Sequence, residues 1–308
     1  MTESSAPRAS GAARMVVSGT LTLDTIERDD VRHADIPGGS ALYGAAAARL
    51  VLPTRIVGTV GTDFPFETLA TLWSGGIDRA GIEVLDGPTF RWHARYERSG
   101  DTRVTISRVR GVAEGRLPPV APTETDDVAL LLGSTDPRIQ AHVRAAHPRA
   151  RVVGLDSMIH WWREFATALA PLLAHVDVVF VDEEELALAV GTADAATGAA
   201  RLMDLGPPLV VVKRGSRGAW LQRRGESAIA ASAVPRMSAT DPTGAGDAFA
   251  GAFVAALARW PERGDAHALR LATAMASFAV ERVGVAALAT AHDDEIARRM
   301  ATVVVSEA

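Results

Sequence analysis

Runs of apolar residues, separated by helical stretches, divide most of this chain into predicted strands and helices. Four continuous apolar runs, VALLLGS, RVVGLDS, VDVVFVD and PLVVVKRG, alternate with stretches such as WWREFATALAPLLAH. Strands that are apolar throughout are buried on both faces, and the helices between them connect parallel neighbours. The pattern therefore predicts an α/β fold with three layers, in which helices cover both faces of a central, mostly parallel sheet.

The first half of the chain places a glycine pair between two predicted strands. MVVSGTLTLD predicts a strand that ends near Asp24, and RIVGTVGTDF predicts a second buried strand. Gly38 and Gly39 precede SALYGAAAARL, whose small side chains are typical of a tightly packed helix. Functional groups gather at the carboxyl ends of parallel strands. The residues predicted at such ends are Ser134, Asp156, Asp182 and Lys213.

A hairpin with one aromatic face is predicted before the regular part of the chain. Phe90, Trp92 and Tyr96 alternate with charged residues, and Ser99–Gly100–Asp101 predicts a turn before TRVTISRV. The charged segment IERDDVRHADIP is typical of an exposed strand or loop. We expect these segments, at about 27–37 and 88–112, to form a small β lid. Its aromatic face covers either a ligand or a partner subunit.

The chain ends and the composition restrict the setting of the protein. Residues 1–13 predict a disordered tail, 14–295 one domain, and 296–308 a C-terminal tail. No apolar run reaches the roughly 18 residues of a membrane span, and the N-terminus lacks a signal peptide's apolar core, so we expect a cytoplasmic protein. A net charge of −5 argues against nucleic acid as a partner. The lack of cysteine excludes disulfides and thiolate metal sites.

The stretch TDPTGAGDAFAGAFVAALARW, residues 240–260, joins a glycine-rich turn to a long apolar helix. Gly244 and Gly246 allow backbone conformations that other residues avoid, so the turn can surround an anion with its N–H groups. The helix that follows has unsatisfied N–H groups and a positive dipole end, both of which favour phosphate. Asp247 lies at this junction. A lone Asp there is either a helix cap or a base beside the anion site.

The remaining motifs favour phosphoryl transfer to an alcohol. The chain contains no Walker loop, no G-x-G-x-x-G after the first strand and no complete G-x-S-x-G elbow. Phosphoryl transfer needs donors that stabilise the moving group and a base aligned with the attacking hydroxyl. The helix dipole lowers the basicity of Asp247, which is tolerable because positioning matters more than basicity in a loose transition state.

These motifs resemble those of the ribokinase-like, or PfkB, carbohydrate and nucleoside kinases. DPTGAGDAFAGAF is similar to the family's C-terminal signature, and PGG at 37–39 to its N-terminal glycine motif. VDEEE at 181–185 resembles the Asn-x-x-Glu element, and VVKRGSRGAW the nucleotide-side strand and turn. The resemblance covers roughly residues 14–290, in the family's order, and implies a ribokinase-like fold with a kinase domain over 14–295.

The resemblance also implies a site. Asp247 would be the catalytic base, and the amides of Gly244, Ala245 and Gly246 would form the anion hole. The other implied or candidate residues fall into three groups: Asp24, Gly38, Gly39, Tyr43 and Trp92 for the substrate; Lys213, Gly215, Gly218 and Thr243 for ATP; and Glu185 with Asp182 for Mg²⁺. The resemblance leaves open whether the protein also requires a monovalent cation, K⁺. Each residue also has a plain alternative, such as a turn residue at Asp24 or a solvated helix face at Glu185.

Several positions depart from the family's pattern. Asp182 replaces the usual Asn of the metal element, and Tyr43 stands where many sugar kinases carry Asn, which suggests a less polar substrate pocket. Asp156–Ser157–Met158 with two following tryptophans replaces an Asp-x-Asn-x-Arg pattern. Lys213, the only lysine of the chain, stands where some members have Thr, and either a phosphate contact or a structural role accounts for it.

The sequence therefore predicts an ATP- and Mg²⁺-dependent kinase that phosphorylates a hydroxyl of a small sugar. A nucleoside kinase is the alternative, since Tyr43, Phe90, Trp92 and Met158 could stack on a base. A catalytically silent sensor on the same fold is a third reading, and an intact Asp247 argues against it. We also expect a homodimer formed through the lid.

Overall fold

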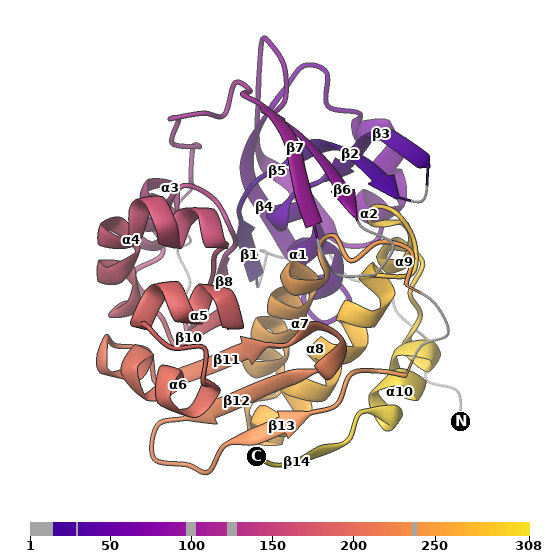
Figure 1. Ribbon diagram of the computed structural model, residues 1–308. Coiled ribbons are helices and arrows are strands. Elements are labelled where there is room, and N and C mark those ends of the chain that lie inside the picture. Colours follow the sequence, from indigo (N-terminus) through magenta and orange to yellow (C-terminus); the bar gives the residue numbers. More distant parts are fainter. Residues whose placement is uncertain (1–14, 29, 97–102, 122–127, 236–238) are drawn as a thin grey trace.

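The central sheet contains ten strands among the residues that the structure describes. The structure is a computed structural model, and it describes residues 15–28, 30–96, 103–121, 128–235 and 239–308. The predicted tail at 1–13 and the predicted turn at 99–101 lie outside these ranges. The strand order is β14-β13-β12-β11-β10-β9-β8-β1-β4-β5, and the run from β11 to β5 is parallel (Figure 1). The bounds are Met15–Ser18 (β1), Thr54–Gly61 (β4), Ile77–Leu85 (β5), Ala129–Leu132 (β8), Val152–Asp156 (β9), Val178–Asp182 (β10), Leu209–Lys213 (β11), Ala219–Arg223 (β12), Ile229–Ala231 (β13) and Val305–Glu307 (β14).

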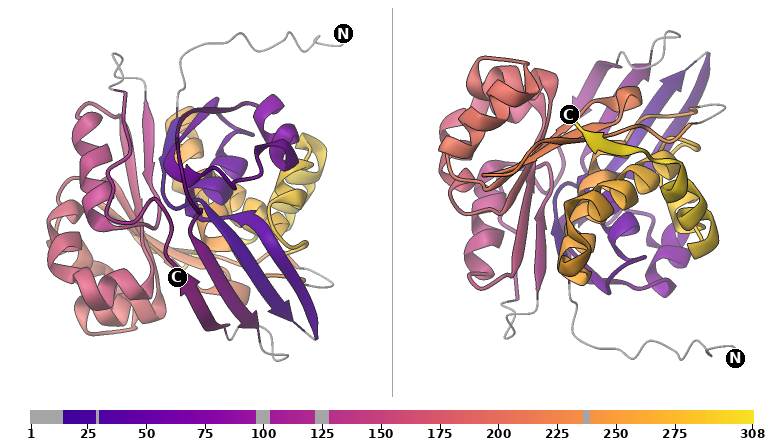
Figure 2. Two further views of the ribbon diagram at one scale, coloured as in Figure 1. Left: turned by 90° about the horizontal axis from the view of Figure 1, so that it is seen from above. Right: turned by 90° about the horizontal axis from the view of Figure 1, so that it is seen from below.

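Helices pack on both faces of this sheet, as Figures 1 and 2 show. In β10, Phe180 points into a core shared with α1, α7 and α8, whereas Val179 and Val181 point into a second core shared with α3 to α6. Neighbouring side chains of a strand point to opposite faces of the sheet. A strand in which every residue is apolar is therefore buried on both faces. The helices are Ser40–Ala48 (α1), Ala70–Ser74 (α2), Pro137–Ala146 (α3), Ile159–Leu173 (α4), Glu183–Val190 (α5), Ala195–Asp204 (α6), Ala245–Arg259 (α7), Gly264–Ala279 (α8), Ala286–Ala289 (α9) and Asp293–Thr302 (α10), with 3₁₀ turns at Phe66–Leu69, Gly215–Arg217 and Pro261–Arg263.

A second, four-stranded sheet stands over one end of the central sheet (Figure 1). Its order is β3-β2-β6-β7, with bounds Thr22–Arg28 (β2), Val31–Gly38 (β3), Arg91–Tyr96 (β6) and Arg103–Val109 (β7). β3, β6 and β7 lie in the segments predicted for the lid. The prediction was wrong for β2, because the first central strand ends at Ser18 and Asp24 lies on a lid strand. The chain turns at Gly19, where a Cβ would lie 2.3 Å from Ser40 Oγ, so only glycine allows this close approach.

The C-terminal segment is part of the fold rather than a tail. Residues 296–308, predicted to be a tail, form most of α10 and all of β14. β14 pairs with β13 in the central sheet, and Ile296 of α10 is buried in the core. The segment contains Ile296, Met300 and the valines at 303–305, but nothing in the local sequence shows that its helix packs against α8. No helix of the described residues is long and apolar enough to cross a membrane.

Candidate active site

A cavity of about 1490 Å³ opens between the lid sheet, the carboxyl ends of the central strands and the start of α7. It brings together residues that are distant in the sequence, so the strand-end residues Ser134, Asp156, Asp182 and Lys213 all line one cavity. Of the predicted site residues, Gly38 alone does not line this cavity. The lining residues are Asp24, Gly39, Tyr43, Trp92, Asp182, Glu185, Lys213, Gly215, Gly218, Thr243, Gly244, Ala245, Gly246 and Asp247.

The glycine turn presents the N-terminus of α7 to the cavity. Gly244 caps the helix with a φ of 76°, in the left-handed region that glycine adopts without strain. A Cβ on Gly244 would lie 2.2 Å from the ring of Tyr43, so the turn also rests directly on that ring. The N–H of Ala245 makes a long bond of 3.3 Å to Pro242 O, whereas Gly246 N–H has no backbone acceptor among the described residues. The helix dipole and these donors favour an anion in front of the turn.

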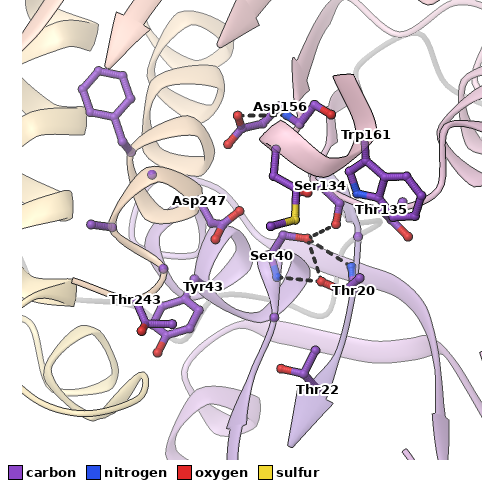
Figure 3. Close-up of a pocket in the computed structure, with 18 of the residues that line it drawn as sticks. Thr20, Thr22, Ser40, Tyr43, Ser134, Thr135, Asp156, Trp161, Thr243 and Asp247 are labelled. Atoms are coloured by element: carbon purple, nitrogen blue, oxygen red, sulfur yellow. Dashed lines mark hydrogen bonds between the residues drawn. The ribbon is translucent and has the colours of Figure 1, made fainter. Parts of the chain in front are cut away.

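Asp247 lies in the first turn of α7 and points into the cavity, as Figure 3 shows. Gly244 occupies the N-cap position and has no side chain to cap the helix, so Asp247 lies inside the first turn rather than at the cap position. Ser40 and Ser134 lie across the cavity from it in the same view. The carboxylate therefore lies between the glycine turn and the side of the cavity that Ser40 and Ser134 line.

Lys213 and Asp156 form a buried ion pair beside the turn. Lys213 Nζ donates to Asp156 Oδ1 at 2.7 Å, and Asp156 is only 2% exposed. A Cβ on Gly246 would lie 3.1 Å from Lys213 Nζ, which places the ammonium next to the first turn of α7. Burial alone would lower the pKa of Lys213, but the carboxylates of Asp156 and Glu185 raise it, so the side chain stays charged.

Asp182 and Glu185 cap helix α5 at the next strand end. Asp182 Oδ1 accepts from Glu185 N at 2.8 Å, and Glu185 Oε2 accepts from Asp182 N at 2.9 Å, which is a capping box. Burial raises the pKa of Glu185 well above its usual range, an effect that a nearby cation would offset. Mg²⁺ commonly binds one or two carboxylates together with substrate phosphates, and this pair fits that pattern because each residue keeps a second carboxylate oxygen outside the cap.

The turn between β11 and β12 closes the far end of the cavity. Gly215 and Gly218 have φ values of 55° and 84°, and a Cβ on Gly218 would lie 1.9 Å from Ala231 O. This close approach of two backbone segments accounts for the glycine at 218. Small and apolar side chains line the same end, as expected for a nucleotide base and ribose: Ala233, Val234, Pro235, Thr273, Ala276, Ser277 and Val280.

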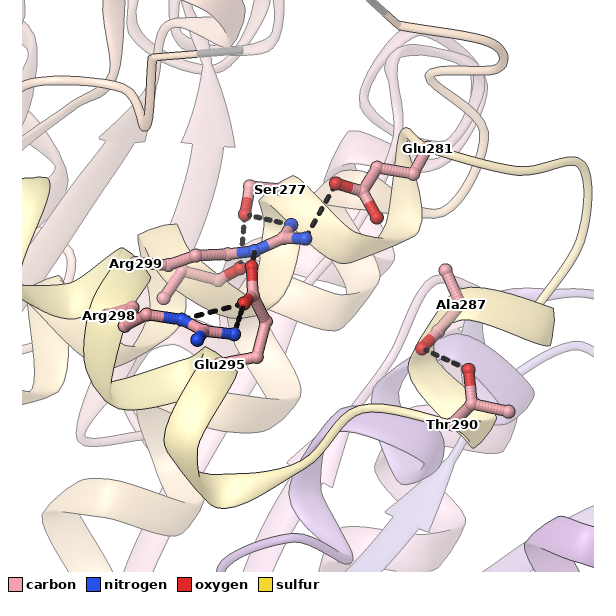
Figure 4. Close-up of polar contacts among 8 residues, drawn as sticks. Ser277, Glu281, Ala287, Thr290, Glu295, Arg298 and Arg299 are labelled. Carbon is pink, nitrogen blue, oxygen red and sulfur yellow. Dashed lines mark hydrogen bonds and ion pairs between the residues drawn. The ribbon is translucent and has the colours of Figure 1, made fainter.

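Polar contacts join helix α10 to the C-terminal end of α8, as Figure 4 shows. Arg299 donates to Ser277 Oγ at 2.9 Å and to Glu281 Oε1 at 2.6 Å. It also donates to Glu295 Oε1 at 3.0 Å, and its guanidinium lies 3.5 Å from the centre of the Phe278 ring. The C-terminal helix therefore fixes the outer side of α8 where that helix lines the cavity.

One side of the cavity is built by β2 and by the segment of the glycine pair at 38–39. Asp24 is 3% exposed, and its Oδ1 has no hydrogen-bond partner among the described residues. Burial, with the nearby charges of Asp241 and Asp247, raises the pKa of Asp24 to about 7. A Cβ on Gly38 would lie 2.2 Å from Asp24 Oδ2, and Gly39 has a φ of 96°. Gly38 thus leaves room for the Asp24 carboxylate, whereas a Cβ on Gly39 would lie 2.3 Å from Thr20 O.

Two predicted site residues, Tyr43 and Thr243, make contacts within the protein that the sequence did not predict. Tyr43 is 2% exposed beneath Gly244, so it supports the turn and offers no open face for stacking. The hydroxyl of Thr243 donates to Asp241 Oδ1 at 2.6 Å, and Tyr96 OH lies 2.7 Å from it. Because the Thr243 hydroxyl donates its proton to Asp241, it accepts a hydrogen bond from the Tyr96 hydroxyl. This bond joins strand β6 of the lid sheet to the glycine turn. Sequence reasoning gave Tyr96 and Asp241 no such role.

Comparison with known proteins identifies the family of this chain. A sequence model described as the pfkB family of carbohydrate kinases matches residues 35–291. The chain belongs to this family. Among curated members, the cytidine kinase of Thermococcus kodakarensis is 30% identical over 251 residues, which cover 80% of this chain and 88% of the relative. The predicted kinase activity and family membership are thus confirmed.

Solved structures of the family share the fold. The Arabidopsis thaliana ribokinase complexed with ribose and ATP superposes with a TM-score of 0.73 and 23% identity, over 94% of this chain and 99% of that one. The Burkholderia thailandensis nucleoside kinase in complex with inosine gives a TM-score of 0.75 and 20% identity, over 94% and 98%. The predicted ribokinase-like, three-layer α/β/α fold is confirmed.

Proposed function

We propose that this pfkB family kinase transfers the γ-phosphoryl group of ATP to a hydroxyl of a sugar or a nucleoside, with Asp247 as the base. The position of Asp247 carries the proposal, because it lies between an anion-binding turn and the buried acceptor-side carboxylate of Asp24 in one cavity. Asp24 would hold a hydroxyl of the acceptor, and Asp247 would accept the proton of the attacking hydroxyl.

The remaining residues of the cavity have supporting roles in this proposal. The amides of Gly244, Ala245 and Gly246 would stabilise charge on the moving phosphoryl group. Mg²⁺, which would neutralise charge on the phosphates, would be held by Glu185 and Asp182 on the free side of their capping box. One relative that is similar over most of its length is a cytidine kinase, which supports a nucleoside as one acceptor class. One structural neighbour is a ribokinase complexed with ribose and ATP, which supports ATP as the donor.

A panel assay tests the proposal. The protein is incubated with ATP and Mg²⁺, in Na⁺ and in K⁺ buffers, with free pentoses and hexoses and with pyrimidine and purine nucleosides, and ADP release is measured together with product mass. We expect one acceptor class to give a product heavier by one phosphate group. Tight ATP binding without turnover of any acceptor would contradict the proposal and favour a nucleotide sensor, and a difference between the two buffers would show a monovalent-cation requirement.

We also propose that two copies associate through their lid sheets. Both edge strands of the lid expose apolar side chains: Val31 on β3 is 53% exposed, and Val104, Ile106 and Val109 on β7 are 44%, 44% and 51% exposed. Exposed edge strands of this kind pair readily with another chain. Light scattering should give twice the chain mass of 32.4 kDa, and Ile106→Lys should lower it. A monomer at high concentration would contradict this proposal.

A further inference from the structure

Two adjacent tryptophans at the start of α4 point in different directions. Successive residues of a helix are about 100° apart, so Trp162 and Trp161 cannot share a face. Trp162 is 4% exposed and belongs to the core, whereas Trp161 is half-buried and lines the cavity. Figure 3 shows Trp161 across the cavity from Asp247. The indole of Trp161 thus forms part of the cavity wall opposite Asp247.

The Trp161 side chain is held in place by its neighbours. Its ring centre lies 4.7 Å from that of His160 and 5.2 Å from that of Phe165, with tilted planes. His160 is fixed in turn, because its Nδ1 lies 2.9 Å from Glu164 Oε1. Phe165 has non-helical dihedrals, φ −132° and ψ 26°, so the first turn of α4 is separate from the rest of the helix. A ring fixed in this way loses little freedom when a ligand stacks on it.

Unsatisfied polar atoms lie in the same part of the cavity wall. Ser157 is 5% exposed and lines the cavity, and its hydroxyl has no hydrogen-bond partner among the described residues. The hydroxyl of Ser134 is in the same state, although its carbonyl oxygen accepts from Ser40 Oγ at 2.7 Å. A buried hydroxyl without a partner destabilises the protein, so these two groups are suited to a polar ligand.

We propose that Trp161 and Met158, with the hydroxyls of Ser134 and Ser157, form a subsite for the heteroaromatic base of a nucleoside acceptor. A base offers a flat face to the indole and polar ring atoms to the hydroxyls, whereas a free sugar offers no face to stack. The inference rests on the proposed function, since the sugar hydroxyl must reach Asp247 while the base contacts Trp161. In this inference the base of a nucleoside stacks on Trp161 rather than on Tyr43.

Nucleoside binding without ATP tests this subsite separately from catalysis. Cytidine, adenosine and ribose are titrated into the wild-type protein and Trp161→Leu, and affinity is measured by calorimetry and tryptophan fluorescence. We expect a nucleoside to quench the wild-type fluorescence and to bind about ten- to hundredfold more weakly to Trp161→Leu, the range expected for loss of one base–aromatic stack. Trp161→Phe, which keeps an aromatic face, should recover most of the affinity.

The control is Trp260→Phe, because Trp260 lies at the far end of α7 against Arg263 and His267. This variant should keep both the quenching and the affinity. Equal nucleoside affinity in wild type and Trp161→Leu, or ribose binding as tightly as the nucleosides, would overturn the subsite. If the kinase proposal failed and no acceptor were phosphorylated, the Trp161-dependent quenching would still be expected, so the two failures are distinguishable.

Discussion

The ion pair of Lys213 and Asp156 leads to the most specific prediction about the phosphate side. Lys213 is the only lysine of the chain, and its Nζ lies 2.7 Å from Asp156 Oδ1 and next to Gly246. One of its three N–H donors is used by Asp156, so the ammonium can also donate to a phosphate oxygen in front of the turn. We expect Lys213→Met to weaken transition-state binding through the loss of this charge.

The size of the effect follows from the charge and its surroundings. Two unit charges 4 Å apart interact by about 4 kcal/mol at an effective dielectric constant of about 20. A loss of about 2–4 kcal/mol corresponds to a decrease of about 30- to 1000-fold in kcat/KM for ATP. Lys213→Arg keeps the charge but not the compact shape, so a smaller decrease is expected because the longer side chain moves its charge away from the turn.

Stability must be separated from catalysis in this experiment. Removing the ammonium leaves Asp156, which is 2% exposed, without its ion-pair partner. Breaking a buried pair costs about 3–5 kcal/mol of unfolding free energy. The double variant Lys213→Met with Asp156→Asn removes both charges and should recover most of that stability. Its kcat/KM should stay low, because the phosphate contact is still missing.

The assay therefore measures three quantities for wild type, the single variants and the double variant. They are the unfolding free energy in urea, kcat/KM for ATP, and the ratio of the affinities for a non-hydrolysable ATP analogue and for ADP. We expect the affinity ratio to fall only where Lys213 is absent. A double variant that is stable and as active as the wild type would refute a role for Lys213 at the phosphates and leave the pair with a structural role.

Three further predictions concern Asp24, Gly244 and Arg299, which line or support other parts of the cavity. Burial raises the pKa of Asp24 from 3.8 in the unfolded chain to about 7 in the folded protein. Between about pH 4 and 7 the folded protein therefore keeps a proton on Asp24 that the unfolded chain releases. The unfolding free energy accordingly falls as the pH rises through this range. Asp24→Asn should therefore raise the unfolding temperature more at pH 8 than at pH 5, and equal shifts would contradict the burial argument. Gly244→Ala and Gly225→Ala both place a Cβ at a positive φ, which costs about 1–2 kcal/mol of unfolding free energy. Only the Cβ at 244 meets another residue, since it would lie 2.2 Å from the Tyr43 ring. Gly244→Ala should therefore lower the unfolding free energy in urea by more than Gly225→Ala does. Arg299→Met should raise KM for ATP severalfold and leave KM for the acceptor unchanged, because Arg299 supports α8 behind the nucleotide end; a change in the acceptor KM alone would contradict this role.

The sequence predicted the parts of the fold that have a strong local pattern. Continuous apolar runs identified the parallel strands, and the strand-end rule placed Asp156, Asp182 and Lys213 at one edge of the sheet. The glycine-rich turn before Asp247 was predicted because glycine at such positions indicates a backbone conformation that other residues avoid. Gly244 has such a conformation, with a φ of 76°. These features depend on neighbouring residues, so one chain segment is enough to recognise them.

Other features depend on contacts between distant segments. Nothing local in residues 296–308 indicates that Arg299 binds Ser277 or that the chain end adds a strand. Tyr43 was a candidate for stacking on a base because its exposure could not be read from the sequence, and the structure buries it under Gly244. The turn at Gly19, which transfers Asp24 to the lid sheet, was also missed, since MVVSGTLTLD has an apolar pattern on both sides of the glycine.

The central claim, that Asp247 is the base of a phosphoryl transfer in this cavity, is tested most directly by Asp247→Asn. The variant keeps the shape of the side chain and removes its ability to accept the proton. With ATP, Mg²⁺ and the acceptor found in the panel, kcat should fall by about 100-fold or more, while calorimetry shows unchanged ATP and acceptor affinities. A kcat within a few-fold of the wild type, at equal binding, would contradict the account.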